Sequence, residues 1–429
     1  MVRNLGLILA GLLACPAGAA QSAGPESSVV ERNYSLEDAI NLGLKNDSRL
    51  LSAEQDRIIS EERVVEARLQ FLPEFGLHGS ATKFNARYPF SLSQDFRNIL
   101  LYPGTPENIY SARGYMYFPI YEGGRSINTV RLAQAAFNQS RSNYESVRRD
   151  VILAVKEAFQ RLLFVQERKA LAQEGLQAAG AAAENPRLDA WERIESNVLL
   201  GHARVRIAEV ERDLRLARLA FLRSLNQEID TSFRVEGRMD PRPVEVDVQK
   251  VALWAMELRP ELQSETYRAE MDAIGVNLAW GRRNPTLFVA SDYEVTAQHF
   301  PLRNNNWDLG IGIRIPLTYD FFTKLRQKRA EQRQGQLKRA ALQDQVRLEV
   351  RQACEHLQYW QAEMSTREAQ YRAVAKLFES LPAGAGPVLA RLKALNSVLD
   401  LRLSYLTSVT EHILARARLE RAVGRELAQ

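Results

Sequence analysis

The residue types that most often do chemistry are few in this chain of 429 residues, and they are not grouped. Its five histidines form no H-x-x-x-H or H-E-x-x-H pair, and neither a C-x-x-C pair nor a G-x-x-x-x-G-K-[ST] phosphate loop occurs. Glu122-Gly123-Gly124 is better interpreted as a strand-to-helix turn than as a phosphate loop, and His299 as a solvated loop residue. We therefore expect no catalytic residue, no metal, no cofactor and no enzymatic activity.

Three acidic side chains, Glu184, Asp189 and Glu192, flank a helix break at Asn185-Pro186. In an oligomer, several copies of them would form a ring that attracts cations. Alternatively, Asp189 and Glu192 serve the first turn of the next helix, whose dipole favours negative charge. The sequence leaves both interpretations open.

The segment from Trp307 to Leu317 alternates strictly between apolar residues and residues that are polar or small. Such alternation predicts a strand with two unlike surroundings, and apolar-out with polar-in is typical of a transmembrane barrel strand. A sheet with one face on a soluble core is the alternative. Three further strand candidates, near residues 75, 116 and 289, favour the membrane. The residues expected to face lipid are Trp307, Leu309, Ile311, Ile313 and Ile315, and those expected to face the lumen are Asp308 and Arg314.

These strands belong to a unit that occurs twice, about 212 residues apart. At that spacing Ala67, Pro73 and Phe75 fall on Ala279, Pro285 and Leu287. A second block repeats at a shorter spacing and places Phe159 on Cys354, which we interpret as a buried hydrophobic residue.

Each copy reads as a helix, a strand hairpin and a pair of very long helices. Apolar residues spaced by threes and fours from Arg125 to about Ala179 predict a coiled-coil seam, and one helix over residues 35–70 and another over 248–281 are expected before the strands. The breaks at the far ends of the long helices are predicted to be two tips. We divide the chain into a signal peptide (1–20), a leader (21–34), a first repeat (35–229), a linker (230–247) and a second repeat (248–429).

The start of the chain predicts export, because Arg3 precedes an apolar run too short to span a bilayer and a region of small residues follows. Cleavage at Ala17-Gly18-Ala19 and lipoprotein processing, with lipidation of Cys15, both fit. Lys and Arg exceed Asp and Glu by only 57 to 52, interleaved along helices, so no nucleic acid is expected as a partner. Four strands cannot close a barrel, and open edges are costly in lipid, so several copies must combine.

With these features in place, the chain resembles the TolC family of outer-membrane efflux proteins. The resemblance rests on Leu36-Glu-Asp-Ala39-x4-Leu44-x-Asn46, on the Ala67-x5-Pro73 junction and its copy, and on two strand-end motifs, Phe118-Pro119-Ile120-Tyr-Glu-Gly123-Gly124-Arg125 and Leu309-Gly-Ile-Gly-Ile-Arg-Ile-Pro316-Leu317. It covers nearly everything after the signal. The second copy departs from the pattern, with Tyr319-Asp-Phe-Phe where a glycine pair is commoner, and the second tip lacks the acidic residues often found there.

The resemblance implies a fold that is mainly α with a transmembrane β part, in which the four strands of each chain contribute to a 12-stranded barrel shared by a homotrimer, above a periplasmic α-helical barrel. It implies a passive exit duct in the outer membrane of a Gram-negative-type bacterium, in contact with outer-membrane lipid. A periplasmic adaptor and an inner-membrane transporter of the RND or ABC type are the implied partners. A periplasmic adaptor and an exported structural coiled-coil protein are the alternatives.

The resemblance also implies that the two tips close the duct and meet the adaptor. Pro186-Arg187-Leu188-Asp189 resembles the family's adaptor-contact motif, although Arg187 also fits an ordinary solvated charge. The tip and adaptor-contact candidates are Pro186, Arg187, Leu188, Asp189, Pro382, Gly384 and Gly386.

Overall fold

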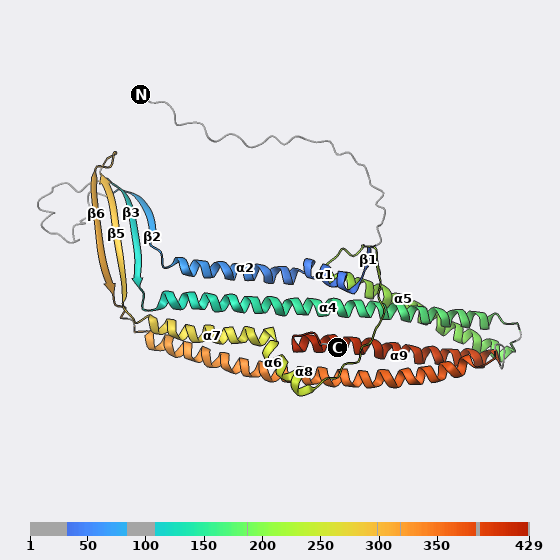
Figure 1. Cartoon of the computed structure of the whole chain (residues 1–429). Helices are drawn as coiled ribbons and strands as arrows, with labels where there is room; N and C mark the ends of the chain where they lie inside the picture. Colours follow the sequence, from blue (N-terminus) through green and yellow to red (C-terminus); the bar gives the residue numbers. More distant parts are fainter. Residues whose placement is uncertain are drawn as a thin grey trace, which may run out of the picture.

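The computed structural model describes residues 32–83, 108–186, 188–297, 299–317, 319–382 and 387–427. The expected signal peptide with Cys15, most of the leader and most of the first hairpin loop lie outside these residues. Figure 1 shows a long bundle of helices that carries a sheet at one end. No helix in the described part of the chain combines the length and apolar character needed to cross a membrane.

The order of elements repeats along the chain, and the predicted fold class, mainly α with a duplicated helix, strand-hairpin and long-helix unit, is confirmed. The elements of the first half are β1 (Arg32–Tyr34), α1 (Leu36–Asn46), α2 (Ser48–Leu69), β2 (Glu74–Lys83), β3 (Asn108–Tyr121), α4 (Arg125–Ala183), α5 (Ala190–Ser224) and β4 (Phe233–Val235). Those of the second half are α6 (Val248–Leu258), α7 (Pro260–Gly281), β5 (Thr286–Ala297), β6 (Asn304–Arg314), α8 (Phe321–Glu379) and α9 (Val388–Val423).

The two longest helices, α4 and α8, each contain 59 residues and are therefore about 90 Å long. Helix α4 contacts α2 and α7 in the half nearer the sheet, and α5 and α9 in the far half. Helix α8 contacts α7 and then α9 along its length. The helices thus lie side by side in the order α2, α4, α7, α8 near the sheet (Figure 1). Toward the tips α4 contacts α5 and α9, α9 contacts α8, and ion pairs also join α5 to α9.

The prediction of single helices over 35–70 and 248–281 is wrong, because each is broken once. Asp47 adopts an extended conformation and caps α2 through its side chain, which accepts from the backbone N–H groups of Arg49 and Leu50. The second break lies at Arg259, where Pro260 occupies the first position of α7. Proline excludes the preceding residue from the helical conformation, so two different residue types produce the same break.

The strand predictions hold in position but not at every end. Strand β3, expected near residue 116, spans Asn108–Tyr121. Strand β6 begins at Asn304, before the alternating segment that starts at Trp307, and ends at Arg314 rather than Leu317. Ile315 therefore lies beyond β6. The short parallel pair β1 and β4, which joins the leader to the linker, was not predicted because three-residue strands carry no periodic signal.

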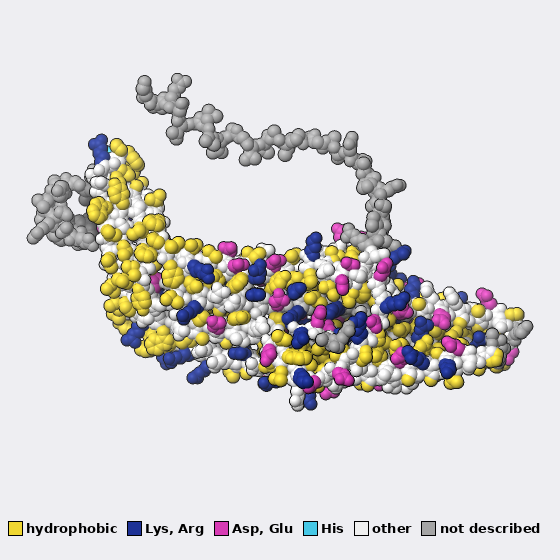
Figure 2. Space-filling model, viewed as in Figure 1, with side chains coloured by type: hydrophobic (Ala, Val, Ile, Leu, Met, Phe, Trp, Pro, Cys, Tyr) yellow, Lys and Arg dark blue, Asp and Glu magenta, His cyan; other side chains and the backbone are white. Residues whose placement is uncertain are grey.

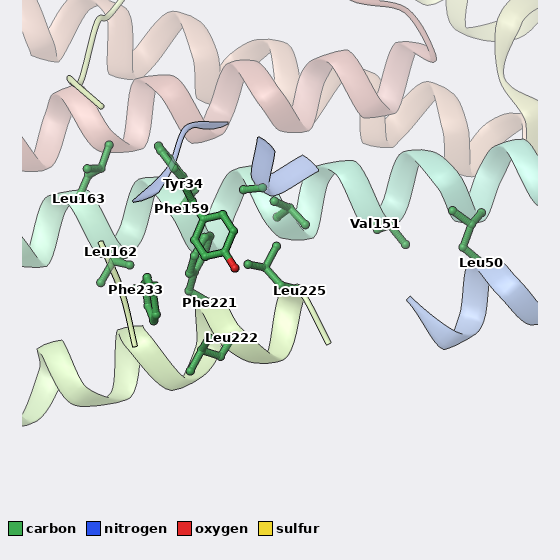
Figure 3. Close-up of a cluster of buried hydrophobic side chains, with 12 residues drawn as sticks. Tyr34, Leu50, Val151, Phe159, Leu162, Leu163, Phe221, Leu222, Leu225 and Phe233 are labelled. Atoms are coloured by element: carbon green, nitrogen blue, oxygen red, sulfur yellow. The ribbon is translucent and has the colours of Figure 1, made fainter. Parts of the chain in front are cut away.

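Each half of the chain has its own buried apolar cluster. In the first, Phe159 and Phe221 pack with Tyr34 and Phe233 of the small parallel pair (Figure 3). In the second, Cys354 is fully buried among Val350, Leu357 and their neighbours. Burial raises the pKa of its thiol. The prediction that Cys354, at the repeat position equivalent to Phe159, is a buried hydrophobic residue is confirmed.

Candidate functional site

The four long strands form one antiparallel sheet in the order β2, β3, β5, β6, and the register gives it two unlike faces. On one face, Leu287 lies opposite Ile313, Val289 opposite Ile311, and Tyr293 opposite Trp307. Side chains on this face are exposed, 75% for Ile311 and 93% for Leu77. Figure 2 shows the hydrophobic side chains gathered over this end of the molecule. An apolar face that no part of the described chain covers needs an apolar environment.

The opposite face carries charged and polar side chains. Arg113 of β3 donates to both carboxylate oxygens of Asp292 on β5, at 2.8 and 2.5 Å. The backbone N–H of Asp292 in turn donates to the Asp308 carboxylate at 3.2 Å, and the hydroxyls of Ser80 and Ser111 share a hydrogen bond of 2.9 Å. Asp308, expected to face a lumen, thus lies on the polar face.

The outer strands β2 and β6 each have one strand partner, so each has an edge without a neighbour among the described residues. Strand edges present rows of N–H and C=O groups that seek another strand. A sheet with two open edges and an exposed apolar face is incomplete as a single chain.

The return from strand to helix in the first half depends on two glycines. Gly123 and Gly124 have φ of 68° and 80°, a region that glycine adopts readily. Asn284 donates to the carbonyl of Gly123 at 3.0 Å, which joins the two halves just below the sheet. The second half makes the same turn without glycines: Asp320 precedes α8, which begins at Phe321.

The first tip lies between α4 and α5, as the break at Asn185-Pro186 predicts. The Asp189 carboxylate accepts from the backbone N–H of Glu192 at 2.7 Å, and the Glu192 carboxylate accepts from that of Asp189 at 3.2 Å. This capping box uses both acids locally. Leu188 is buried and Glu184 is exposed, while Arg187 lies outside the described residues.

The second tip lies between α8 and α9. Pro382 is exposed after the end of α8, and Pro387 precedes α9 with φ of −63°. Gly384 and Gly386 lie outside the described part of the chain. The two breaks nevertheless end the paired long helices at the same end of the bundle (Figure 1).

Sequence reasoning missed the pairing of Arg113 with Asp292, because the first-half strands showed weak alternation. Arg113 lies on β3 between Ala112 and Gly114, small residues that blur the pattern. The sequence nonetheless indicated that Arg113 lies on the polar face of β3, because it alternates with the residues of the apolar face. Among the described residues, no group of three or more His, Cys, Asp or Glu side chains could hold a metal ion.

Residues 39–227 match the family model described as outer membrane efflux protein. Over these residues, somewhat less than half of the chain, the protein is similar to the outer membrane efflux protein family. No curated protein matches the chain. Channels of the family are trimeric and work with adaptor and inner-membrane transporter proteins, and the family is one of ducts rather than enzymes.

Solved structures of outer membrane channels share the fold of this chain over nearly its whole length. The outer membrane protein VceC of Vibrio cholerae is 15% identical with a TM-score of 0.74, covering 91% of this chain and 96% of its own. The Campylobacter jejuni CmeC outer membrane channel is 14% identical with a TM-score of 0.73, covering 91% and 85%. The Neisseria gonorrhoeae MtrE outer membrane channel, in its open state, is 17% identical with a TM-score of 0.72, covering 91% and 89%.

The efflux protein is thus located in the outer membrane, with its helical part in the periplasm, and serves as an exit duct. The resemblance seen in the sequence is confirmed. Neither alternative, the adaptor nor the structural coiled-coil protein, gains support.

Proposed function

We propose that three copies of this chain close one 12-stranded barrel, through which solutes leave the cell passively. The observation that carries the proposal is a single sheet with an exposed apolar face, a polar face and two open edges, β2 and β6. In lipid each unpaired backbone group costs several kcal/mol, and joining β2 of one copy to β6 of the next removes both edges. The long helices then form one tunnel below the barrel.

Conductance tests this proposal directly. The purified full-length protein, added to a planar lipid bilayer, is expected to produce discrete conductance steps and to migrate as a trimer without heating. A protein that remains monomeric and conducts no ions in the bilayer would contradict it.

The orientation of the barrel strands is a proposal of its own. Trp307, Leu309, Ile311 and Ile313 of β6 face outer-membrane lipid, as does Ile315 just beyond the strand, while Asp308 and Arg314 face the lumen. Support comes from the register, which puts Asp308 on the face of the Arg113–Asp292 pair.

Ile313→Arg tests this orientation, because a charge on the lipid face costs about 2–4 kcal/mol near the bilayer midplane. We expect the trimer to dissociate at a lower temperature, measured by gel mobility after graded heating. Gly312→Arg, on the opposite face, is less useful because Phe288 crowds that position. Asp308→Arg is the better control and should assemble normally; equal heat resistance of the Ile313→Arg variant and the parent would mean that the register is wrong.

We further propose that the repeats correspond to 35–229 and 248–429, joined by the linker 230–247, behind a signal peptide (1–20) and a leader (21–34). An inner-membrane transporter of the RND or ABC type would supply the energy through an adaptor that docks at the tips. The tip contacts would involve Pro186, Arg187, Leu188, Asp189, Pro382, Gly384 and Gly386. Because the duct itself is passive, the pump would set the choice of substrate.

Cysteines test whether the tips close the duct. One cysteine at Glu184 and one at Pro382, crosslinked between neighbouring copies, should lower conductance, and reduction should restore it. Cys354 would not interfere, since it is fully buried. Full conductance in the crosslinked form would place the gate elsewhere.

The acids of the first tip have two competing roles, and the capping box supports the local one. Replacing Asp189 by Asn and Glu192 by Gln should leave the reversal potential in a salt gradient unchanged and cost about 1 kcal/mol of stability. A ring formed with Glu184 around the pore predicts a loss of cation selectivity instead. The reversal potential therefore decides between a cap and a selectivity ring.

A further inference from the structure

A hollow of about 550 Å³ lies directly below the sheet, between α4, α7 and α8. Leu132, Met271 and Leu278 supply apolar lining. Arg282 and Lys324 line it beside the points where the chain passes between helix and strand. Its position and mixed lining distinguish it from the faces of the sheet.

The start of α8, which supplies part of the lining of this hollow, is rich in positive charge. Residues 319–340, at the start of α8, contain seven Lys and Arg against two Asp and Glu, a surplus of five that equals the net charge of the entire chain. The corresponding start of α4, residues 122–143, contains three against one. The positive surplus is therefore five at the start of α8 and only two at the start of α4.

The cations that line the hollow differ in whether they form ion pairs within the chain. Arg282 is exposed and forms no ion pair with any described residue, whereas Lys324 pairs with Asp320 and Lys328 with Glu331 at 2.6 Å. One further acid, Asp272, lines the hollow, and burial raises the pKa of its carboxyl group. Arg282 is thus placed to accept an added anion, with Lys324 in the same lining.

Large apolar side chains lie exposed at the same level. Trp280 is 45% exposed, Phe322 62% and Leu317 89%. Aromatic residues gather where a membrane meets water, and lysine and arginine extend their charged ends toward lipid headgroups from such positions. A hollow with apolar walls and a cationic rim at that boundary matches the two chemical parts of a phospholipid.

We propose that this hollow binds the phosphate headgroup of an anionic phospholipid from the leaflet nearest the helices, with Arg282 and Lys324 contacting the phosphate. Leu132 and Leu278 then contact the adjoining apolar part of the lipid. The inference rests on the proposed barrel, which puts this level at the membrane boundary. A different occupant for the exposed rim of α8 is α2 of a second copy, which carries Glu61, Glu62 and Glu66.

Lipid retention tests the proposal. Full-length channel in detergent is mixed with equal amounts of phosphatidylglycerol and phosphatidylethanolamine, and native mass spectrometry counts the lipids bound per trimer. We expect a preference for phosphatidylglycerol. Because each Lys or Arg near an anionic surface changes affinity about fivefold, Arg282→Gln with Lys324→Gln should weaken phosphatidylglycerol binding roughly 25-fold and leave phosphatidylethanolamine unchanged.

Arg329→Gln with Arg333→Gln is the matched control, since it removes equal charge from positions on α8 outside the hollow. It should retain phosphatidylglycerol. Equal loss in both double variants, or no lipid preference in the parent, would overturn the proposal, and so would loss of the trimer in the first variant, which would assign the cations to a neighbouring α2. Conductance in zwitterionic bilayers is measured in parallel, so that failure of the channel itself is recognised separately.

Discussion

The molecule contains two junctions at which a tip helix meets the end of a sheet-side helix, and they are built from different chemistry. At the first, α5 ends beside the α1–α2 break (Figure 1). There the Asn226 side chain donates to the carbonyl of Asn46 at 2.9 Å, and the Asn46 side chain donates to that of Leu225 at 3.5 Å. The contacts are neutral amide hydrogen bonds.

The second junction, where α9 meets the α6–α7 break, is ionic. Arg259 is only 4% exposed and donates to Glu261 at 3.1 Å and to Glu349 at 2.5 Å. Arg421 of α9 joins Glu261 at 2.8 Å and Asp150 of α4 at 2.7 Å. One network thus ties α4, α7, α8 and α9 together.

The comparison teaches that one duplicated geometry can be held in two ways with different sensitivities. A neutral hydrogen bond contributes about 0.5–1.5 kcal/mol, so losing one is tolerated. An ion network around one buried arginine is more demanding, because each hydrogen bond to a charged group contributes about 1.5–3 kcal/mol and several of them share that arginine. The second junction should therefore be the more sensitive to substitution and to pH.

The largest effect is expected from Arg259→Ala. It removes two charge-assisted hydrogen bonds, to the partly buried carboxylates of Glu349 and Glu261, at a cost of about 3–5 kcal/mol, measured from urea unfolding followed by circular dichroism. Arg49→Ala at the first junction, where the side chain is 63% exposed, should change stability by less than about 1 kcal/mol. Similar losses in both variants would erase the distinction between the junctions.

A smaller effect is expected from Gly424→Ala. Gly424 has φ of 80°, and an added Cβ would meet the Arg149 guanidinium and lie 3.1 Å from the Leu258 carbonyl oxygen. We expect a loss of about 1–3 kcal/mol, seen as a lower urea midpoint. The first junction has Asn226 in the same left-handed region, with φ of 50°.

Asn226→Gly is the counterpart, since glycine relieves the backbone while the hydrogen bond to Asn46 is lost. These effects oppose each other, so the net change should stay below about 1 kcal/mol. If Asn226→Gly lost more stability than Gly424→Ala, the first junction would be the more sensitive of the two to substitution.

The smallest effect concerns acid. Burial alone raises the pKa of Glu349, but hydrogen bonds from Arg259 and Gln345 outweigh it and hold the pKa below its ordinary 4.5. A lowered carboxyl pKa stabilises the fold above 4.5, and this contribution is lost as pH falls through the folded value. Hydrogen exchange at the ends of α7 and α9 should therefore speed up as pH falls below 4.5, after correction for the intrinsic rate.

At the first junction Asp47 also has a lowered pKa, so its contribution to stability is likewise lost on acidification, at lower pH. Burial raises its pKa, and hydrogen bonds from Arg49 and Leu50 hold it below the ordinary 3.8. On acidification the second junction should loosen before the first. Glu349→Gln should remove the acid response near α7, and an unchanged response in that variant would assign it to another group.

The sequence by itself determined the duplication, the long helices, the four strands, their apolar faces and the two tips. These features are carried by local periodicity and by strong breaks such as Asn185-Pro186, which act within a few residues whatever surrounds them. Periodicity also identified Cys354 as a core residue at the repeat position equivalent to Phe159, because both lie on the apolar stripe of a long helix.

Only the tertiary structure decided what depends on residues far apart in the chain. The β1–β4 pair joins segments about 200 residues apart, the Arg113–Asp292 pair needs the β3–β5 register, and the ionic junction gathers Asp150, Arg259 and Arg421 from separate helices. A charge in a sequence shows only that it must be solvated or paired. Its partner is chosen by packing, because burial removes water and makes the nearest opposite charge decisive.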